Sequence, residues 1–282
     1  MKNPWIKFHI KQQFDQKSIR DFLMHFDVSK KKIYKLDVEK AFKVNRSICH
    51  VDTVLNKGDL LELNLSILNT SQVQPISHDI DVVYEDDDMI ILNKSVDCLV
   101  YSDGIDQHTL TNFVNANRPQ SFYTILPVHR IDYETSGLVV FAKHPLTLSY
   151  LSKLFENHEV EKWYVCLVEN HLKNKKGFIN QPIGKDRHSN LMRVSPSGKK
   201  AYTSYEVLEE RPQYSLLRVN IKSGRKHQIR VHLRSIGYPV VSDKLYGHIN
   251  LNYKRLMLHF ETIKFVHPRT FKPLIVSSKA DF

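Results

Sequence analysis

Residues 129–143 read HRIDYETSGLVVFAK, a loop of ionisable and small side chains that runs directly into an apolar segment. The run from Leu138 to Ala142 predicts a buried strand. Loops that a rigid strand positions often carry binding and catalytic residues. The same residues are also typical of a turn closed by a salt bridge, so the pattern alone indicates only a candidate site.

A second dense stretch covers residues 223–234 and reads SGRKHQIRVHLR. Helical periodicity from about residue 226 places His227, Arg230 and Arg234 on one face, at positions i, i+3 and i+7. Such a face can bind a carboxylate or a phosphate. The alternative from periodicity is a solvated basic helix.

The chain beyond residue 81 mixes strand-like and helical segments. Pro145–Phe155 has a helical period, and strand-like runs lie on both sides of it. Strict β-α-β repetition is missing, and this mixed order predicts an α+β fold. The sequence has no glycine-rich phosphate loop of the dinucleotide or Walker type, so we expect no nucleotide cofactor. The strand-like runs are 89–92, 137–142, 163–168, 201–208 and 215–221.

The 282-residue chain is basic, with 41 Lys or Arg against 30 Asp or Glu and a net charge of +11. This excess favours partners that carry phosphates or anionic lipids. No apolar run reaches transmembrane length, and the N-terminus lacks the apolar core of a signal peptide, so we expect no membrane association. The isolated Cys49, Cys98 and Cys166 form neither a disulfide framework nor a zinc motif, and they indicate the reducing cytoplasm.

Residues 1–70 are the more basic part, with 13 Lys or Arg against 8 Asp or Glu. Ser18 precedes a helical pattern in which Asp21 takes the position of a capping-box acid. Ser29 opens a second helix whose lysines project outward while Ile33 faces inward. Short strands at 42–45 and 59–65 complete a compact module. The outward side chains, which are candidates for phosphate contacts or for a merely solvated helix face, are Lys30, Lys31, Lys32 and Lys35.

Polar residues without a sustained period follow at 66–80 and predict a linker, which we place at 71–80. The predicted domains are therefore a small module at 1–70 and a main domain at 81–282. In Val44-Asn45 and Gly58-Asp59 the module resembles a small α/β RNA-binding fold, shared by a ribosomal small-subunit protein and many RNA-modifying enzymes. It departs from that fold at Arg46, where glycine is usual, and around the second helix.

The segment HRIDYETSGLVVFAK resembles the catalytic motif HRLDxxTSGLLLFAK of the RluA and RluD type of RNA pseudouridine synthase. Other segments resemble successive blocks of this family in the same order, which is far more specific than one short motif. The resemblance runs from Tyr84 to Phe282 and implies the pseudouridine synthase fold, with a central mixed, largely antiparallel sheet. The blocks are YEDDDMIILNK (84–94), EKWYVCLV (161–168), KKAYTSYEVL (199–208), SGRKHQIRVHL (223–233), SDKLYG (242–247) and RLMLHF (255–260).

The resemblance implies a role for each of four residues. Asp132 falls on the catalytic aspartate, which either attacks C1′ of the ribose or removes its 2′ proton, and the sequence does not choose between these routes. Arg130 falls on an arginine that helps to flip the nucleotide, and Tyr164 on the tyrosine that stacks on the base. Arg230 falls on the partner of the aspartate. Without the resemblance, Tyr164 is an ordinary strand aromatic.

Three further residues belong to the expected substrate-binding set, namely His129, Arg225 and His227. We expect the two histidines to shape the loop and the helix start by hydrogen bonding. The sequence contains no metal-binding or catalytic-triad motif around them, so we expect no metal. Ser242 stands where the family usually has glycine, before Asp243.

The expected activity is isomerisation of uridine to pseudouridine in structured RNA without a cofactor, by a monomer. The resemblance makes large-subunit rRNA the first expected target and tRNA the second. A competing hypothesis of a different class is an RNA-binding or ribosome-assembly factor that has kept the fold and does not depend on the chemistry. The presence of Arg130, Asp132, Tyr164 and Arg230 argues against this second hypothesis.

Overall fold

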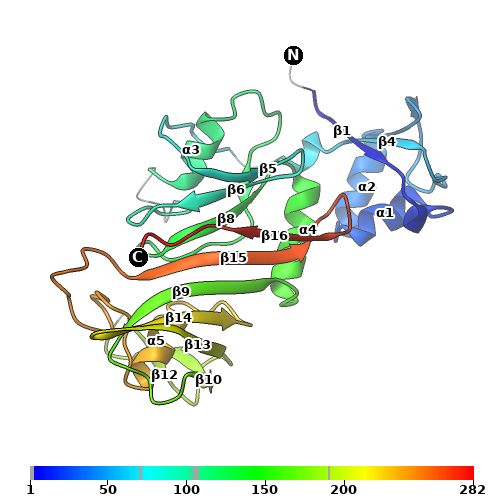
Figure 1. Cartoon of the computed structure of the whole chain (residues 1–282). Helices are drawn as coiled ribbons and strands as arrows, with labels where there is room; N and C mark the ends of the chain where they lie inside the picture. The colour runs from blue at the N-terminus through cyan, green and yellow to red at the C-terminus, as the bar shows by residue number, and fades with distance from the viewer. Residues whose placement is uncertain (1–2, 70–71, 103, 105–107, 190) are drawn as a thin grey trace.

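The computed structural model describes residues 3–69, 72–102, 104, 108–189 and 191–282. These residues form a small N-terminal sheet with two α-helices and a large mixed sheet with three more (Figure 1). The predicted α+β architecture, a small module ahead of a mixed and largely antiparallel sheet, is confirmed. The predicted boundary between residues 70 and 71 lies outside the described residues.

The N-terminal module is an antiparallel sheet in the order β1-β4-β2-β3. The Ser18 hydroxyl accepts from the Asp21 amide at 3.1 Å and Asp21 accepts from the Ser18 amide at 3.0 Å, so the predicted capping box starts the first helix. The elements are β1 (Trp5–His9), α1 (Ile19–His25), α2 (Lys30–Val38), β2 (Phe42–Val44), β3 (Ser47–Ile48) and β4 (Leu60–Asn64), with 3₁₀ turns at Gln12–Phe14 and Ser66–Leu68.

Strand β1 was not among the predicted strands, although its pattern alternates. Phe8 is buried, whereas Lys7 and His9 on either side are exposed. All five residues of β1 pair with β4. The alternation is too short to be recognised without its partner strand.

The large sheet has the order β10-β13-β14-β9-β15-β8-β6-β5, with β16 beside β15 and β7 beside β8. Its strands are β5 (Val82–Glu85), β6 (Met89–Lys94), β7 (Leu126–Pro127), β8 (Ser136–Ala142), β9 (Glu161–Glu169), β10 (Lys176–Asn180), β13 (Tyr202–Arg211), β14 (Tyr214–Ile221), β15 (Leu258–Val266) and β16 (Pro273–Ser277). A separate hairpin pairs β11 (Ile183–Lys185) with β12 (Met192–Val194), and the helices are α3 (Leu110–Ala116), α4 (Pro145–Glu156) and α5 (Gln228–Ser235).

Strand β15 joins the two halves of the large sheet, because it lies between β8 and β9. Its pairing with β8 is parallel and covers His259 with Ser136 and Phe260 with Gly137. Gly137 has a φ of 115°, and a Cβ atom there would lie 2.4 Å from the Phe260 carbonyl oxygen. Only glycine permits this approach. The glycine of the HRIDYETSG segment therefore fixes the loop before β8 against the centre of the sheet.

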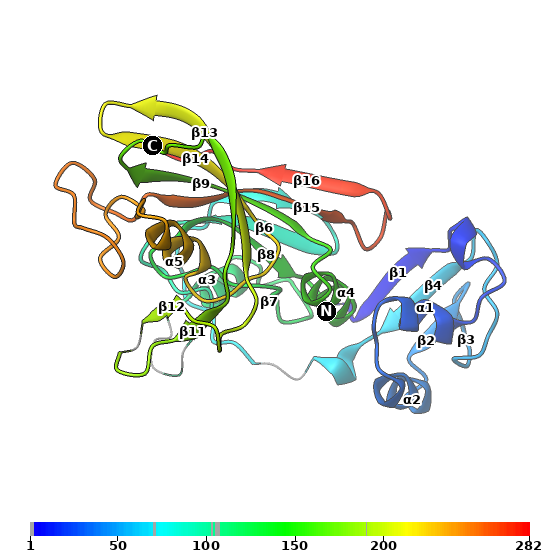
Figure 2. The same ribbon diagram turned by 90° about the horizontal axis from the view of Figure 1, so that it is seen from below.

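Helix α4 lies between the large sheet and the N-terminal module in both views (Figures 1 and 2). A single cluster of buried apolar residues extends through both parts, from Phe8 to Val276. Among the described residues, no helix combines the length and apolar character needed to cross a membrane.

Candidate active site

A cavity of about 370 Å³ opens where the two halves of the large sheet meet. The loop before β8, the middle of the sheet and the start of α5 all contribute to its walls. This brings together the two dense stretches, which lie almost a hundred residues apart in the sequence. The lining residues are Arg130, Ile131, Asp132, Thr135, Tyr164, Ile221, Gly224, Arg225, Lys226, His227, Gln228, Ile229, Arg230 and Leu258.

Asp132 is partly buried in the wall that the loop forms. Its backbone carbonyl accepts from the Thr135 amide at 3.1 Å, which closes the turn. Among the described residues, its carboxylate makes no hydrogen bond and no ion pair of its own. The carboxylate is therefore held by its backbone and faces the cavity with its oxygens available.

Arg230 is buried, with 1% of its surface exposed, and it makes a two-pronged ion pair with Asp243. Its Nε and Nη2 atoms lie 2.8 and 2.6 Å from the two Asp243 oxygens, and Nη2 also lies 3.0 Å from Glu134 Oε2. Burial alone would lower the pKa of Arg230, but the bond to Asp243 and the charges of Asp243, Glu134 and Asp132 raise it.

The expected direct pairing of Arg230 with Asp132 is therefore not found. The Arg230 guanidinium makes its bidentate pair with Asp243. It contacts the loop through Glu134, two residues after Asp132. Asp132 lies within electrostatic reach of the guanidinium without a hydrogen bond to it. Arg230 thus fixes the loop that carries Asp132 and also adds a positive charge beside the carboxylate.

Tyr164 on β9 is buried in the floor of the cavity, and its ring stacks on Phe260 of β15 at a centroid distance of 4.5 Å. Burial, followed by the negative charge of Asp132, raises the pKa of Tyr164 above its usual value. The side chain is therefore a neutral phenol at physiological pH. A neutral phenol is a poor proton acceptor but offers a flat surface for stacking.

Arg130 stands at the rim of the cavity and is exposed. Its Nη1 atom donates to the Tyr101 hydroxyl at 2.8 Å, and its guanidinium lies 4.8 Å from the centre of the Tyr101 ring. This contact joins the loop to the segment after β6, and no sequence pattern predicts it. Both side chains are open to solvent, so the arginine can leave this position at little cost.

The start of α5 differs from the prediction, because the helix begins at Gln228 rather than near residue 226. His227 has a φ of 55° and is not helical, and its Nδ1 atom lies 2.8 Å from the Tyr246 hydroxyl. Gln228 holds the preceding turn by accepting from the Ser223 hydroxyl at 2.8 Å and from the Arg225 amide at 3.1 Å. His227 and Arg225 both line the cavity.

Arg234 lies four residues after Arg230 within α5, but it is exposed and does not line this cavity. The non-helical His227 lies outside the helix that the two arginines share. The Arg225 side chain donates to the Lys200 carbonyl at 3.1 Å, which holds it along the cavity wall. Burial lowers the pKa of His227, although the charge of Asp132 opposes this shift.

His129 lies behind the loop and does not line the cavity, which corrects its placement among the substrate-binding residues. Its ring stacks on Phe155 at 4.7 Å, and its Nε2 atom accepts from the Val140 amide at 3.1 Å. Burial lowers its pKa to about 3, so the ring is neutral. The expectation that His129 shapes the loop by hydrogen bonding agrees with these contacts.

Lys94, at the end of β6, supports the site from outside the predicted set of site residues. It is 1% exposed, and its ammonium group donates to the carbonyls of Ser95, Cys98 and Tyr133 at 2.7, 2.9 and 3.1 Å. Burial lowers its pKa to about 8. Because Tyr133 follows Asp132, the bond from Lys94 to the Tyr133 carbonyl helps to hold the loop in place. The sequence signal for this lysine is its place in Asn93-Lys94, within the family-like block at 84–94.

Ser242 also has a structural explanation, since its φ of 59° is the left-handed conformation that glycine adopts most easily. Its hydroxyl donates to the Tyr253 carbonyl at 2.6 Å, a bond that glycine cannot make. The next residue, Asp243, is fully buried and accepts from the Leu245 and Tyr246 amides at 3.0 Å each. The turn thus presents Asp243 to Arg230.

The four lysines of α2 are exposed on the N-terminal module and lie outside the cavity, while Ile33 and Leu36 of the same helix are buried, as predicted. The four lysines form a basic surface, which we call the α2 lysine face. Its members are Lys30, Lys31, Lys32 and Lys35.

Comparison with known families covers both parts of the chain. Residues 88–235 match the model of the RNA pseudouridylate synthase family, and residues 6–61 match that of the RluD ribosomal pseudouridine synthase N-terminal domain. The human protein RNA Pseudouridylate Synthase Domain Containing 1 shares the fold, with a TM-score of 0.64 and 24% identity over 74% of this chain and 87% of its own.

Three bacterial relatives illustrate the similarity in sequence. A Bacillus subtilis relative named as the uncharacterized RNA pseudouridine synthase YhcT is 34% identical over 85% of this chain and 81% of its own length. The ribosomal large subunit pseudouridine synthase C of Vibrio parahaemolyticus is 32% identical over 86% and 82%. The tRNA pseudouridine synthase C of Haemophilus ducreyi is 30% identical over 72% and 92%. With the cavity and its loop, these matches show that the chain belongs to the RluA/RluD-type family of RNA pseudouridine synthases.

Proposed function

We propose that this enzyme isomerises specific uridines in large-subunit rRNA, with Asp132 as the catalytic carboxylate. The observation that carries the proposal is a carboxylate with no hydrogen-bonding partner in the part of the chain that the structure describes, in a cavity floored by the Tyr164 ring and bordered by arginines. The Vibrio relative named for the large ribosomal subunit supports rRNA as the first target. The Haemophilus relative named for tRNA makes tRNA the second candidate.

The chemistry asked of Asp132 is the handling of an electron-deficient ribose while the C–N bond breaks and a C–C bond forms. An ionised carboxylate can attack C1′ or remove the 2′ proton, and both routes need its oxygens free of protein partners. The neighbouring guanidinium of Arg230 favours the ionised form. Glu134 and Lys94 hold the loop so that the carboxylate needs little reorganisation when the substrate binds.

The target base must leave the RNA stack before it can reach Asp132. Tyr164 supplies a flat neutral ring on which the flipped uracil stacks. Arg130 leaves the Tyr101 ring and fills the space that the base vacates in the RNA, which its exposed position allows. Arg225 and His227 contact the nucleotide from the α5 side of the cavity.

We further propose that the enzyme works as a monomer in the cytoplasm and needs no metal. The three cysteines are isolated in the sequence, which is compatible with a reducing compartment. The isomerisation is redox-neutral and uses no hydrolytic water, so it makes no chemical demand for a Lewis acid. Full activity of the purified protein in the presence of a chelator would support the last point.

Mapping of pseudouridines across total RNA from cells with and without this protein tests the function directly. We expect one or a few positions in large-subunit rRNA to lose the modification, and purified protein to restore them without nucleotide. Loss of positions only in tRNA would favour the second target. An unchanged map, together with an inactive purified enzyme, would refute the proposal.

Thr135 offers a sharp prediction about substrate binding. Its Oγ1 atom is buried at the cavity wall and has no hydrogen-bond partner among the described residues. A buried unpaired hydroxyl costs about 1–3 kcal/mol, so its retention needs an explanation. We infer that this hydroxyl bonds the bound nucleotide. Thr135→Val should lower kcat/KM by roughly tenfold or more, and thermal unfolding should show equal or higher stability.

Thr135→Ser, which keeps the hydroxyl, is the control and should retain most of the activity. A purely structural role for Thr135 predicts the opposite pattern, with Thr135→Val less stable and fully active per folded molecule. Denaturation curves and single-turnover conversion on the same preparations separate the two cases.

The α2 lysine face leads to a prediction about salt. Replacing Lys30, Lys31, Lys32 and Lys35 by Gln should weaken RNA binding and reduce the slope of log Kd against log salt concentration by up to about 3. This replacement is a more specific test than deletion of residues 1–70, because the deletion would also expose apolar side chains of the catalytic domain. An unchanged slope in a filter-binding titration would rule out phosphate contacts by this face.

A further inference from the structure

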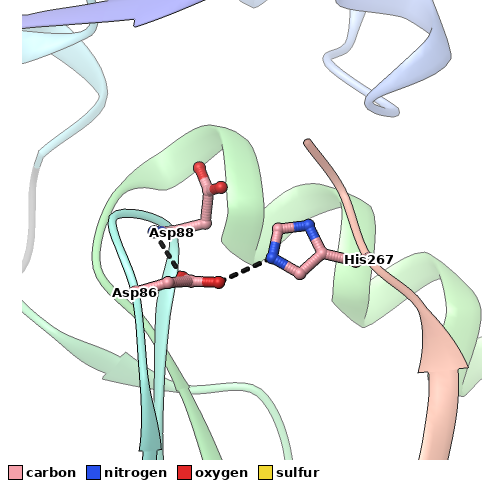
Figure 3. Close-up of side chains that lie close together, drawn as sticks. All are labelled: Asp86, Asp88 and His267. Carbon is pink, nitrogen blue, oxygen red and sulfur yellow. Dashed lines mark hydrogen bonds and ion pairs between the residues drawn. The ribbon is translucent and has the colours of Figure 1, made fainter. Parts of the chain in front are cut away.

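A cluster of ionisable side chains far from the cavity joins the turn between β5 and β6 to the end of β15. Asp86 Oδ2 lies 2.6 Å from His267 Nε2, and Asp88 lies beside them (Figure 3). The three possible ligand atoms all lie within 4.8 Å of one another. By spacing alone this is a candidate metal site.

The charges around this cluster argue against a metal. Both oxygens of Asp88 accept from the Arg269 guanidinium at 2.7 Å, and one also lies 3.0 Å from His144 Nε2. Asp86 accepts from the Tyr84 hydroxyl at 2.6 Å in addition to its contact with His267. A guanidinium in this position repels a cation and already neutralises the buried Asp88. The cluster is an ion-pair network whose centre is Arg269.

Arg269 also connects this network to the N-terminal module. Its Nη1 atom donates to the Lys7 carbonyl of β1, and its guanidinium lies 4.3 Å from the centre of the Phe8 ring. In the other direction, the Lys11 ammonium donates to the carbonyls of Arg269 and Thr270 at 2.9 and 3.2 Å. The turn between β15 and β16 is therefore bonded to the module from both sides.

Aromatic packing extends the same contact. The Phe271 ring lies 5.6 Å from Phe14 and 5.4 Å from His25, and the Tyr150 ring of α4 lies 5.5 Å from Phe26. Phe14 and Phe26 belong to the module, whereas Phe271 and Tyr150 belong to the catalytic domain. Burial of these rings favours one docked arrangement over a loosely tethered one.

A second contact lies at the other end of β1, at Tyr123. Its hydroxyl accepts from the Leu65 amide at 2.9 Å and donates to the Pro4 carbonyl. Leu65 follows β4 and Pro4 precedes β1, and the two strands are antiparallel, so these two bonds hold one end of the β1–β4 pair. Together with the Phe271 and Tyr150 rings, Tyr123 and Arg269 bond the module to the catalytic domain at several points. The orientation of the module is fixed although the segment at 72–80 that follows it is polar and irregular.

We propose that this docking fixes the separation between the α2 lysine face and the Asp132 cavity, and that the fixed separation selects the RNA substrate. Arg269 is the main positioning residue of the docked module. The proposal rests on the proposed function, because it takes the α2 lysine face as an RNA contact. Held at a constant separation from the Asp132 cavity, the face favours RNAs that place a phosphate-rich segment at that separation from the target uridine. Because the module is already ordered, binding costs no orientational entropy of a tethered domain.

The test compares a release variant with the wild-type full-length chain. The release variant combines Arg269→Met, Asp88→Asn and Phe271→Ser, so that no buried charge is left without its partner. Its matched control is Arg211→Met with Glu209→Gln and Leu208→Ser, which removes an exposed ion pair and a half-exposed apolar side chain of β13. Small-angle scattering and proteolysis within residues 72–80 report whether the module is docked.

Two RNA substrates report the functional consequence. One is a long fragment of the modified rRNA, and the other is a short hairpin that holds the same uridine and little else. We expect the release variant to expand in solution and to lose roughly tenfold in kcat/KM on the long RNA through KM. Its kcat/KM on the hairpin should stay at the wild-type value, and the control variant should match wild type on both.

Three results would overturn the proposal. A release variant that stays compact would show that these contacts do not hold the module. A released module with unchanged selection of the long RNA would show that docking has no part in recognition. Equal losses on both RNAs would place the effect in the catalytic domain itself. Failure of the wild type to convert either RNA would instead refute the proposed function, while scattering would still report docking.

Discussion

Asp132→Asn is expected to abolish conversion of uridine to pseudouridine, lowering the single-turnover rate by at least roughly 10²–10⁴-fold. The amide has nearly the shape of the carboxylate but can neither attack C1′ nor remove the 2′ proton. The fold should be unaffected, because the carboxylate has no side-chain bond to lose among the described residues. Release of tritium from C5-labelled uridine, which accompanies the isomerisation, measures the rate.

RNA affinity separates chemistry from binding in this variant. Loss of a negative charge beside a phosphate-bearing ligand should leave affinity unchanged or slightly higher. Asp79→Asn, at an exposed carboxylate outside the cavity, is the matched control and should be fully active. Conversion by Asp132→Asn at the wild-type rate would end the catalytic assignment. If both proteins restored rRNA maturation equally in cells, the binding-factor role would be the one that matters.

Arg230→Met is expected to have the largest effect on stability. The substitution leaves the fully buried Asp243 without its guanidinium partner and frees Glu134 from the same group. Breaking a buried ion pair on one side costs about 3–5 kcal/mol, so the urea midpoint should fall sharply. Activity should also fall, because the loop loses its tie through Glu134 and Asp132 loses the adjacent positive charge.

A double variant distinguishes the two consequences of this change. Asp243→Asn combined with Arg230→Met removes both charges and should recover part of the lost stability, while the catalytic defect remains. Arg230→Lys keeps the charge without the two-pronged geometry and should lie between wild type and Arg230→Met in both respects. A loss of less than about 1 kcal/mol in Arg230→Met would contradict the role assigned to this ion pair.

Much of the fold was readable from local pattern. The capping box at Ser18 and the buried face of α2 depend on neighbours in sequence, and both are as predicted. Strands β1 and β15 were not predicted as strands, for a shared reason. Each interrupts its apolar residues with Lys, His or Thr, and each is held by a partner strand that is distant in the sequence. Local alternation carries no information about such a partner.

The candidate site was likewise predicted only in part. The resemblance identified the residues that meet at the cavity, including Asp132, Tyr164 and Arg230. It did not identify what holds them, because ion pairs such as Arg230 with Asp243 depend on how two turns pack. His129 illustrates the opposite error, in which a residue inside a catalytic motif supports the loop from behind. Membership of a catalytic motif indicates where a residue lies in the fold, but it does not indicate which way the side chain points.

The position of β15 has a consequence for how the protein is made on the ribosome. Asp132 and Arg130 belong to the half of the sheet that is synthesised first, whereas Tyr164 and Arg230 come from the second half. The strand that joins the halves runs from Leu258 to Val266, close to the end of the chain. The nascent chain therefore has no complete cavity until β15 has been translated, and shorter nascent chains hold no assembled site with which to modify RNA.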